Sequence, residues 1–97
     1  MSVRVVTVHC TANLCRSPLA AVLLASHLER LEVSDVLVRS AGTHAYAGAR
    51  AVSESRKAAA ARALSLEHHR AQLLDGSMAR SSDLILCAAS DHRDHVL

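Results

Sequence analysis

A cysteine and an arginine lie six positions apart near the start of the chain, in the stretch CTANLCRS (residues 10–17). A run of β-branched residues precedes this stretch, and an apolar segment with helical spacing follows it. A short loop that leads into a helix points several backbone N–H groups at one place, and the helix dipole adds positive charge there. Such a loop can bind an oxyanion of the size of phosphate. It contains no Gly-Lys-Ser/Thr sequence and is therefore not a Walker nucleotide loop.

Cys10 and Arg16 supply the two chemical groups that a phosphate-cleaving loop needs. The positive field that attracts phosphate also lowers the pKa of a thiol, so we expect Cys10 to form thiolate near neutral pH. The planar guanidinium of Arg16 can bind two phosphate oxygens at once. The pattern predicts attack of sulfur on phosphorus through a cysteinyl-phosphate intermediate.

The elements around the loop are predicted from hydrophobic periodicity. We expect strands over residues 3–8, 36–38 and 83–89, and helices over residues 17–31 and 51–66. Ser17 is predicted as the N-cap of the first helix and Pro18 as its first helical residue. Alternating strands and helices predict a three-layer α/β domain with a parallel sheet, spanning residues 1–97. Ligands of such sheets bind beyond the carboxyl ends of the strands, which is where Cys10 lies.

Composition excludes several other functions. The 97 residues carry a formal charge of +2 without a Lys/Arg run, so no nucleic-acid binding is expected. The longest nearly apolar run, residues 18–25, is too short to span a membrane, and the first residues do not form a signal peptide. We therefore predict a cytoplasmic protein without a membrane partner. Its three cysteines do not indicate a disulfide framework.

The histidines do not predict a metal site. His92 and His95 lie one helical turn apart, and His68 and His69 are adjacent, but neither pair has a convincing third ligand. We expect no metal and no cofactor. His9 points away from its neighbour Cys10 if the strand alternates, so it is not assigned as a base.

The stretch CTANLCRSP resembles the signature of low-molecular-weight protein-tyrosine phosphatases, Cys-x₅-Arg-Ser followed by Pro. SAGT (residues 40–43), Tyr46, HHRAQLL near residue 70 and DLIL…DHR near residue 85 follow in the family's order and approximate spacing. The resemblance covers essentially the whole chain. It implies a sheet of order 2-1-3 and a substrate that is a phosphotyrosine protein or an aryl phosphate.

The resemblance also implies roles for individual residues. Cys10 would be the nucleophile and Arg16 the phosphate clamp. Asn13 would hold the unusual backbone shape of the loop, since Asn tolerates left-handed conformations. Ser17 would hydrogen-bond the thiolate and cap the helix, and Tyr46 would line the substrate cleft. The loop residues that would surround the phosphate are Thr11, Ala12, Asn13, Leu14, Cys15 and Ser17, and Cys15 could form a protective disulfide with Cys10.

The chain departs from the family pattern at several positions. Ala12 stands where the family most often has Gly, Ala21 replaces a frequent Glu, and Gln72 stands where Arg is common. The family continues through a fourth strand, an Asp-Pro loop that supplies the general acid, and a final helix. The present sequence ends at Leu97 and contains no Asp-Pro. We expect a truncated domain with impaired turnover, and possible self-association at the edge left open beside the third strand.

Two other functions stay open. Thioredoxin-coupled arsenate reductases share this loop and fold, but they need a resolving cysteine on a mobile segment after the third strand. Cys87 lies within the predicted strand and is expected to be a core residue. The other alternative is a non-catalytic phosphate-binding remnant that kept the loop and lost turnover.

Overall fold

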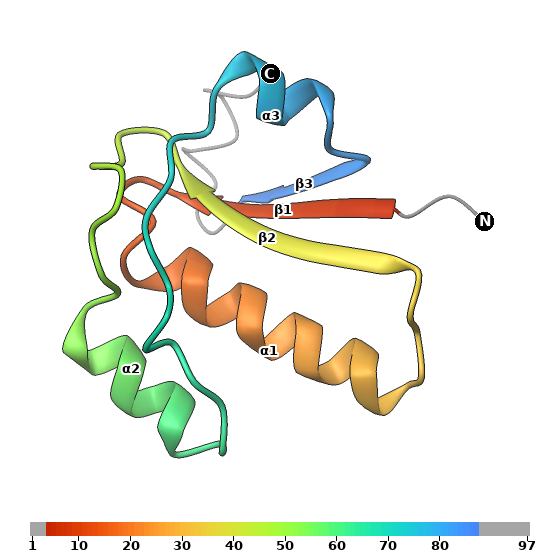
Figure 1. Ribbon diagram of the computed structural model, residues 1–97, viewed down its shortest axis with the longest axis vertical. Helices are drawn as coiled ribbons and strands as arrows, with labels where there is room; N and C mark the ends of the chain where they lie inside the picture. Colours follow the sequence, from red (N-terminus) through yellow and green to blue (C-terminus); the bar gives the residue numbers. More distant parts are fainter. Residues whose placement is uncertain (1–3, 88–97) are drawn as a thin grey trace.

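A computed structural model describes residues 4–87 of the chain. Its element order is strand, helix, strand, two helices and a strand, which is an α/β architecture. The elements are β1 (Arg4–Cys10), α1 (Arg16–Arg30), β2 (Val36–Gly42), α2 (Ser53–Ala60), α3 (Gly76–Arg80) and β3 (Leu84–Cys87). The three strands form a parallel sheet of order β2-β1-β3 (Figure 1), so the predicted fold class and sheet order are confirmed.

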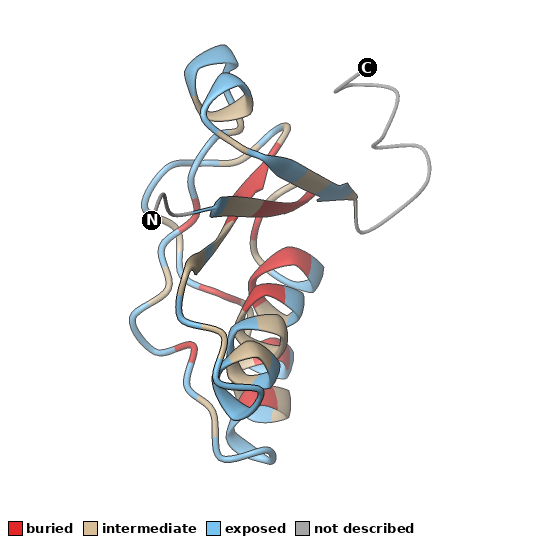
Figure 2. Cartoon of the chain, turned by 90° about the vertical axis from the view of Figure 1, so that its right-hand side faces the viewer, coloured by how far each residue is buried: buried red, intermediate tan, exposed pale blue. Residues whose placement is uncertain are grey.

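The helices lie on both sides of the sheet. α1 and α2 lie on one side, and the short α3 lies on the other (Figure 1). Between α1 and α2 the core contains the buried residues Ala51, Ala59 and Leu66, and the partly buried Leu19, Val22 and Leu64 pack against them. Buried positions also continue along the last residues of β1 and β2 (Figure 2). In this chain with one aromatic residue, alanine is thus the commonest buried hydrophobic residue among those that the structure describes.

The strand register brings the predicted site to one edge of the sheet. Cys10 at the end of β1 pairs with Gly42 at the end of β2, and His9 pairs with Cys87 at the end of β3. All three strands are parallel, so their carboxyl ends lie together. The loop of residues 10–17 begins at this edge, as predicted.

On the side of α3, Arg39 connects the helix to the sheet. Its Nε donates to Thr7 Oγ1 (2.9 Å), and Nη2 donates to the Met78 carbonyl (2.9 Å) and to Ser82 Oγ (3.0 Å). The guanidinium of a β2 residue therefore joins β1 to the segment that leads into β3.

Several predicted boundaries are wrong. The helix predicted over residues 51–66 ends at Ala60, because Ala63 adopts φ 59° and the Leu64 N–H bonds to the Ala59 carbonyl, a left-handed helix end. β2 extends to Gly42, four residues past its predicted end. Of the strand predicted over 83–89, residues 84–87 are observed, and residues 88–89 lie outside the described part of the chain.

The predicted helix cap at Ser17 is also wrong. α1 begins at Arg16 with Cys15 in the N-cap position, and no side chain caps this end. Ser17 and Pro18 are therefore the second and third helical residues, and both are buried. The Ser17 hydroxyl is free for another role because it does not cap the helix.

β3 is the least protected strand of the sheet. Within residues 4–87 it pairs with β1 on one side only, and Leu84 and Leu86 are exposed. Cys87, predicted as a core residue, is instead partly exposed, since it ends this edge strand. No helix among the described residues is long and apolar enough to cross a membrane.

Candidate active site

The Cys10 thiol lies at the bottom of the loop, almost fully buried. Its Sγ is 3.1 Å from Ser17 Oγ. Burial alone raises the pKa of this thiol. The hydroxyl of Ser17 and the backbone N–H groups of Ser17, Asn13 and Cys15 lower it, and the pKa of Cys10 stays below its usual value. The loop thus stabilises negative charge at the sulfur atom, as the sequence predicted.

Asn13 holds the shape of the loop. Its backbone has φ 59°, the left-handed conformation predicted for it, and its side chain is fully buried. Nδ2 donates to Ser17 Oγ (2.8 Å), and Oδ1 accepts from the Gln72 backbone N–H (2.9 Å). The carbonyl of Asn13 accepts from His69 Nε2 (2.8 Å). One residue therefore orients the hydroxyl beside the thiol and ties the loop to a segment almost 60 positions away.

Gly42 lets the end of β2 approach the loop closely. A Cβ at this position would lie 2.6 Å from the Thr11 carbonyl oxygen and 2.8 Å from the Asn13 nitrogen. Just beyond it, the N–H groups of Thr43 and His44 donate to the carbonyls of Cys10 and Thr11 (3.1 and 2.8 Å). The backbone of residues 11–13 therefore leaves no room for a side chain at position 42.

The segment of residues 69–74 is hydrogen-bonded to the last residues of β2. Gln72 Nε2 donates to the Ser40 carbonyl (2.8 Å), and the Gln72 carbonyl accepts from the Gly42 N–H (2.9 Å). The Leu74 N–H then donates to the Gly42 carbonyl (2.8 Å). Gln72, which departs from the family pattern, is therefore hydrogen-bonded on both its backbone and its side chain.

Comparison with known proteins decides the family. The sequence profile described as "Low molecular weight phosphotyrosine protein phosphatase" matches residues 5–97. The chain belongs to this family.

Two curated relatives illustrate its range. The chain is 39% identical over 87 residues to the low molecular weight protein-tyrosine-phosphatase Etp of Escherichia coli K12, covering 90% of this chain and 55% of that protein. It is 37% identical over 84 residues to a protein-arginine-phosphatase of Bacillus subtilis, covering 87% of this chain and 55% of that protein. The chain thus spans little more than half the length of these relatives.

Solved structures agree with the fold. A YwlE mutant from Bacillus subtilis superposes with a TM-score of 0.91 at 30% identity, covering 96% of this chain and 62% of that chain. The tyrosine phosphatase amsI of Erwinia amylovora superposes with a TM-score of 0.86 at 36% identity, covering 97% of this chain and 59% of that chain.

In this member of the phosphatase family, the other predicted site residues differ in how far they are exposed. Arg16 is exposed at the first position of α1, and it makes no ion pair with any residue between 4 and 87. Tyr46 is 86% exposed in the segment after β2. Thr11 and Cys15 are exposed, and Ala12 and Leu14 are half-buried. Cys10 and Cys15 are both free thiols, so the protective disulfide stays a prediction.

The start of α2 packs against the loop of this phosphatase-family domain. The Val52 N–H donates to the Leu14 carbonyl (2.8 Å), and Ser55 Oγ donates to the Cys15 carbonyl (3.1 Å). These bonds fix the rim of the loop on the side of α2.

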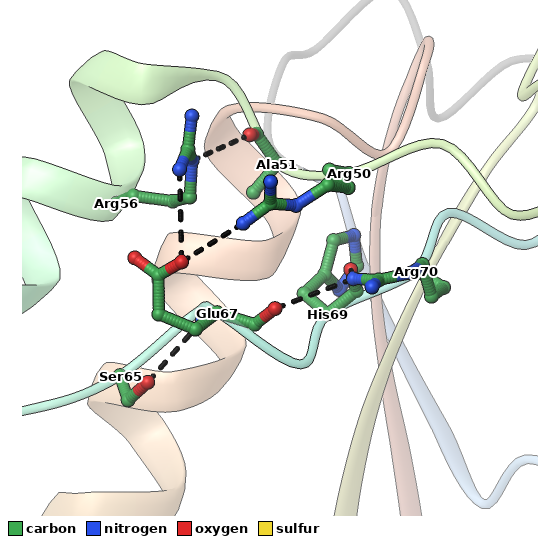
Figure 3. A network of polar contacts seen from close by, with 7 residues as sticks. All are labelled: Arg50, Ala51, Arg56, Ser65, Glu67, His69 and Arg70. Atoms are coloured by element: carbon green, nitrogen blue, oxygen red, sulfur yellow. Dashed lines mark hydrogen bonds and ion pairs between the residues drawn. The ribbon is translucent and has the colours of Figure 1, made fainter.

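A polar network holds the same helix start from outside (Figure 3). The Glu67 carboxylate lies 2.9 Å from Arg50 Nη2 and 3.6 Å from Arg56 Nη1, and Arg56 Nε donates to the Ala51 carbonyl. Arg50 and Glu67 are more than half exposed, so these ion pairs contribute little to stability. They connect the start of α2 with the segment that carries His69.

No group of three potential metal ligands occurs among the described residues. His69 is bonded to Asn13, and His68 is exposed. His92 and His95 lie outside the residues that the structure describes.

Sequence reasoning gave no structural role to three residues of the site: Gly42, His69 and Gln72. They contact a loop that lies 30 to 60 positions earlier, so no local spacing connects them with Cys10. The motifs SAGT and HHRAQLL contained them and were the available signal.

Proposed function

We propose that the chain hydrolyses phosphate monoesters on proteins through a cysteinyl-phosphate intermediate, with Cys10 as the nucleophile. The observation that carries this proposal is the environment of the Cys10 sulfur. A hydroxyl at 3.1 Å and three backbone N–H groups stabilise its charge, which is what a thiolate nucleophile at neutral pH requires.

The first step forms a bond between Cys10 Sγ and phosphorus while the bond from phosphorus to the leaving oxygen breaks. Loop N–H groups and the Arg16 guanidinium stabilise the charge on the other three phosphate oxygens. Water then attacks phosphorus, phosphate leaves, and Cys10 returns as thiolate. The Ser17 hydroxyl stabilises the departing sulfur in this second step, and Asn13 holds that hydroxyl in place.

Protonation of the leaving group needs a general acid, which we do not assign among these 97 residues. The resemblance assigns this step to the Asp of an Asp-Pro loop, and these 97 residues contain no Asp-Pro. Phenolate of tyrosine is a poor leaving group, because its conjugate acid has a pKa near ~10. A positioned acid typically contributes ~10²–10⁴ in rate to such a step. We therefore propose impaired turnover of phosphotyrosine by this chain.

The substrate class has two candidates. Of six similar curated proteins, five are named as low molecular weight protein-tyrosine-phosphatases, three of them as probable, and one is named as a protein-arginine-phosphatase. Phosphotyrosine protein or aryl phosphate is the substrate we propose, and phosphoarginine is the second candidate.

The test compares hydrolysis rates over a series of aryl phosphates whose leaving groups differ in acidity. Nitrophenyl phosphate should be cleaved slowly but measurably, and a phosphotyrosine peptide far more slowly. A flat dependence with robust phosphotyrosine turnover would contradict the impairment. Asp91→Ala and Asp94→Ala, two positions outside the described residues, would then identify a substitute acid.

The same preparation separates the other functions. Faster release of phosphate from a phosphoarginine peptide than from a phosphotyrosine peptide would favour the second substrate. Arsenate reduction in the presence of thioredoxin would indicate the reductase. Phosphate or vanadate binding without any hydrolysis would indicate a binding remnant. Cytoplasmic location and the absence of nucleic-acid and membrane partners stay predictions from the sequence.

A further inference from the structure

A second thiol of the molecule is paired with an imidazole. Cys87 Sγ, at the end of β3, lies 2.9 Å from His9 Nε2, in the neighbouring strand β1 (strands in Figure 1). The two residues are direct partners in the strand register, so their side chains leave the sheet on the same face. His9 is fully buried, and Cys87 is partly exposed.

This pair is separate from the phosphate loop. Successive residues of a strand point to opposite faces, so His9 and Cys10 point away from each other. Cys10 Sγ contacts Ser17 of α1, which places Cys10 on the face of the sheet that α1 covers. The imidazole therefore contacts Cys87 on the opposite face from the proposed nucleophile.

A thiol and an imidazole within hydrogen-bonding distance are the signature of an activated sulfur nucleophile. Transfer of the thiol proton to the imidazole gives a thiolate that accepts a hydrogen bond from the imidazolium N–H, and this contact stabilises the charged form. Thiolates that solvent can reach are the cysteines that peroxides oxidise first.

We propose that Cys87, activated by His9, is an oxidation site that reacts with hydrogen peroxide independently of the phosphate loop. The Cys87 thiolate attacks one peroxide oxygen, an S–O bond forms, and the O–O bond breaks. Sulfur is oxidised to sulfenic acid, and the proton held by His9 passes to the departing hydroxide, which leaves as water. Hydrogen peroxide is the only co-reactant.

Cys15 provides an internal comparison. It is exposed, whereas Cys87 is only partly exposed. If access alone governed the reaction, Cys15 would be oxidised faster. Activation by His9 predicts the reverse order.

The first experiment treats the folded Cys10→Ser chain, in which Cys15 cannot form the predicted disulfide with Cys10, with limiting hydrogen peroxide and traps sulfenic acid with a cyclic 1,3-dione. Peptide mass spectrometry then gives the rate at each cysteine. We expect Cys87 to react roughly tenfold faster than Cys15. Equal rates, or a faster Cys15, would overturn the proposal.

The second experiment isolates the contribution of the imidazole. In a chain with Cys10→Ser and Cys15→Ser, Cys87 is the only thiol, and its reaction rate is measured in the folded state and in urea. The folded state should react roughly tenfold faster, and His9→Gln should abolish the difference. If the Cys10→Ser, Cys15→Ser chain that keeps His9 reacts equally fast in the folded state and in urea, activation is refuted. This outcome is decisive even if His9→Gln fails to fold. Neither experiment depends on phosphatase activity.

Discussion

β1 has two neighbours that differ in how firmly they are held. On the side of β2 the pairing covers seven residues, from Arg4 with Val36 to Cys10 with Gly42, and backbone bonds continue it into the loop. On the side of β3 the pairing covers four residues, and the strand has an exposed outer edge within the described chain. Each side ends at a thiol, Cys10 or Cys87.

The two thiols are stabilised in different ways. Several fixed groups surround Cys10, and they are held in turn by Asn13 and by the close approach of Gly42. Cys87, on a short edge strand, contacts the His9 imidazole. Preorganised N–H groups suit an anionic ester that must be held in one geometry, whereas a single imidazole is sufficient for a small oxidant.

Substitution of each thiol gives the largest contrast. Cys10→Ser should lower hydrolysis of nitrophenyl phosphate by roughly 10⁴-fold or more, because it removes the nucleophile. It should still bind vanadate and phosphate, since the loop N–H groups and Arg16 remain. Cys87→Ser should keep hydrolysis within about twofold of the parent, as it lies across the sheet.

Steady-state rates and anion titrations measure both effects. Parent-like hydrolysis by Cys10→Ser would eliminate the nucleophile assignment. A large loss in Cys87→Ser would mean that the two sides of β1 are not independent.

Asn13→Ala should have the next largest effect, because the hydrogen bonds of Asn13 hold the loop that follows β1 on the side of β2. The change leaves the Gln72 N–H without its acceptor and removes the Asn13 hydrogen bond to the buried Ser17 hydroxyl. We expect a loss of about 2–4 kcal/mol in the free energy of unfolding. The pKa of Cys10 should rise toward its usual value, since Ser17 is one of the groups that lower it.

Two measurements check this. Urea unfolding gives the stability, and the pH dependence of iodoacetamide reaction at Cys10 should move to higher pH in the variant. Asn13→Gly is the matched control, because glycine adopts the same positive φ without strain but makes no side-chain bond. If Asn13→Gly behaves as the parent, the backbone conformation and not the hydrogen bonds accounts for the effect.

Gly42→Ala should reduce both stability and activity by a smaller amount. The new methyl group would lie within 2.9 Å of three backbone atoms of the loop, so the end of β2 or the loop must move. We expect a cost of about 1–3 kcal/mol and slower hydrolysis, measured by urea unfolding and steady-state assay. Gly76→Ala is the control, since its Cβ would meet only the flexible end of Arg80 at 3.0 Å. Equal effects of the two substitutions would contradict the tight approach.

The sequence predicted the parts of this comparison that depend on local pattern. Short apolar runs located all three strands, and the eight residues from Cys10 to Ser17 contained the thiol, its hydroxyl partner and the left-handed Asn13. The errors arose where long-range packing overrides propensity. Ala63 favours a helix by propensity but terminates one here, and Ser17, a good N-cap residue, instead contacts Cys10.

The support around the loop could not be predicted, for a geometric reason. His69 and Gln72 contact Asn13 only because the chain returns along β2 after α2, and that return depends on the tertiary fold. The His9–Cys87 contact depends likewise on the register of β3 against β1. Pairings of residues more than 50 positions apart leave no periodic signal in one sequence.

Charged residues introduced on β3 should have the smallest effect on folding. They also test directly whether the exposed edge of β3 binds a second copy. Leu84 and Leu86 are 50% and 39% exposed, so replacing either with lysine should change the free energy of unfolding by less than about 0.5 kcal/mol. An exposed apolar edge strand promotes pairing with a second copy, and lysine on the edge opposes it. We therefore expect the parent chain to self-associate and Leu84→Lys with Leu86→Lys to weaken that association by roughly tenfold or more. Sedimentation velocity over a range of concentrations measures it.

Leu31→Lys is the matched control, because Leu31 is 59% exposed but lies at the end of α1, away from the strand edge. It adds one charge, as Leu84→Lys alone does, and removes a similar apolar area, so a general effect of charge would weaken association as much in this variant as in Leu84→Lys. If only the lysine substitutions on β3 weaken self-association, the two copies pair through the edge of β3. A parent chain that stays monomeric at high concentration would show that this edge does not bind a second copy, and the comparison would then rest on the two thiols alone.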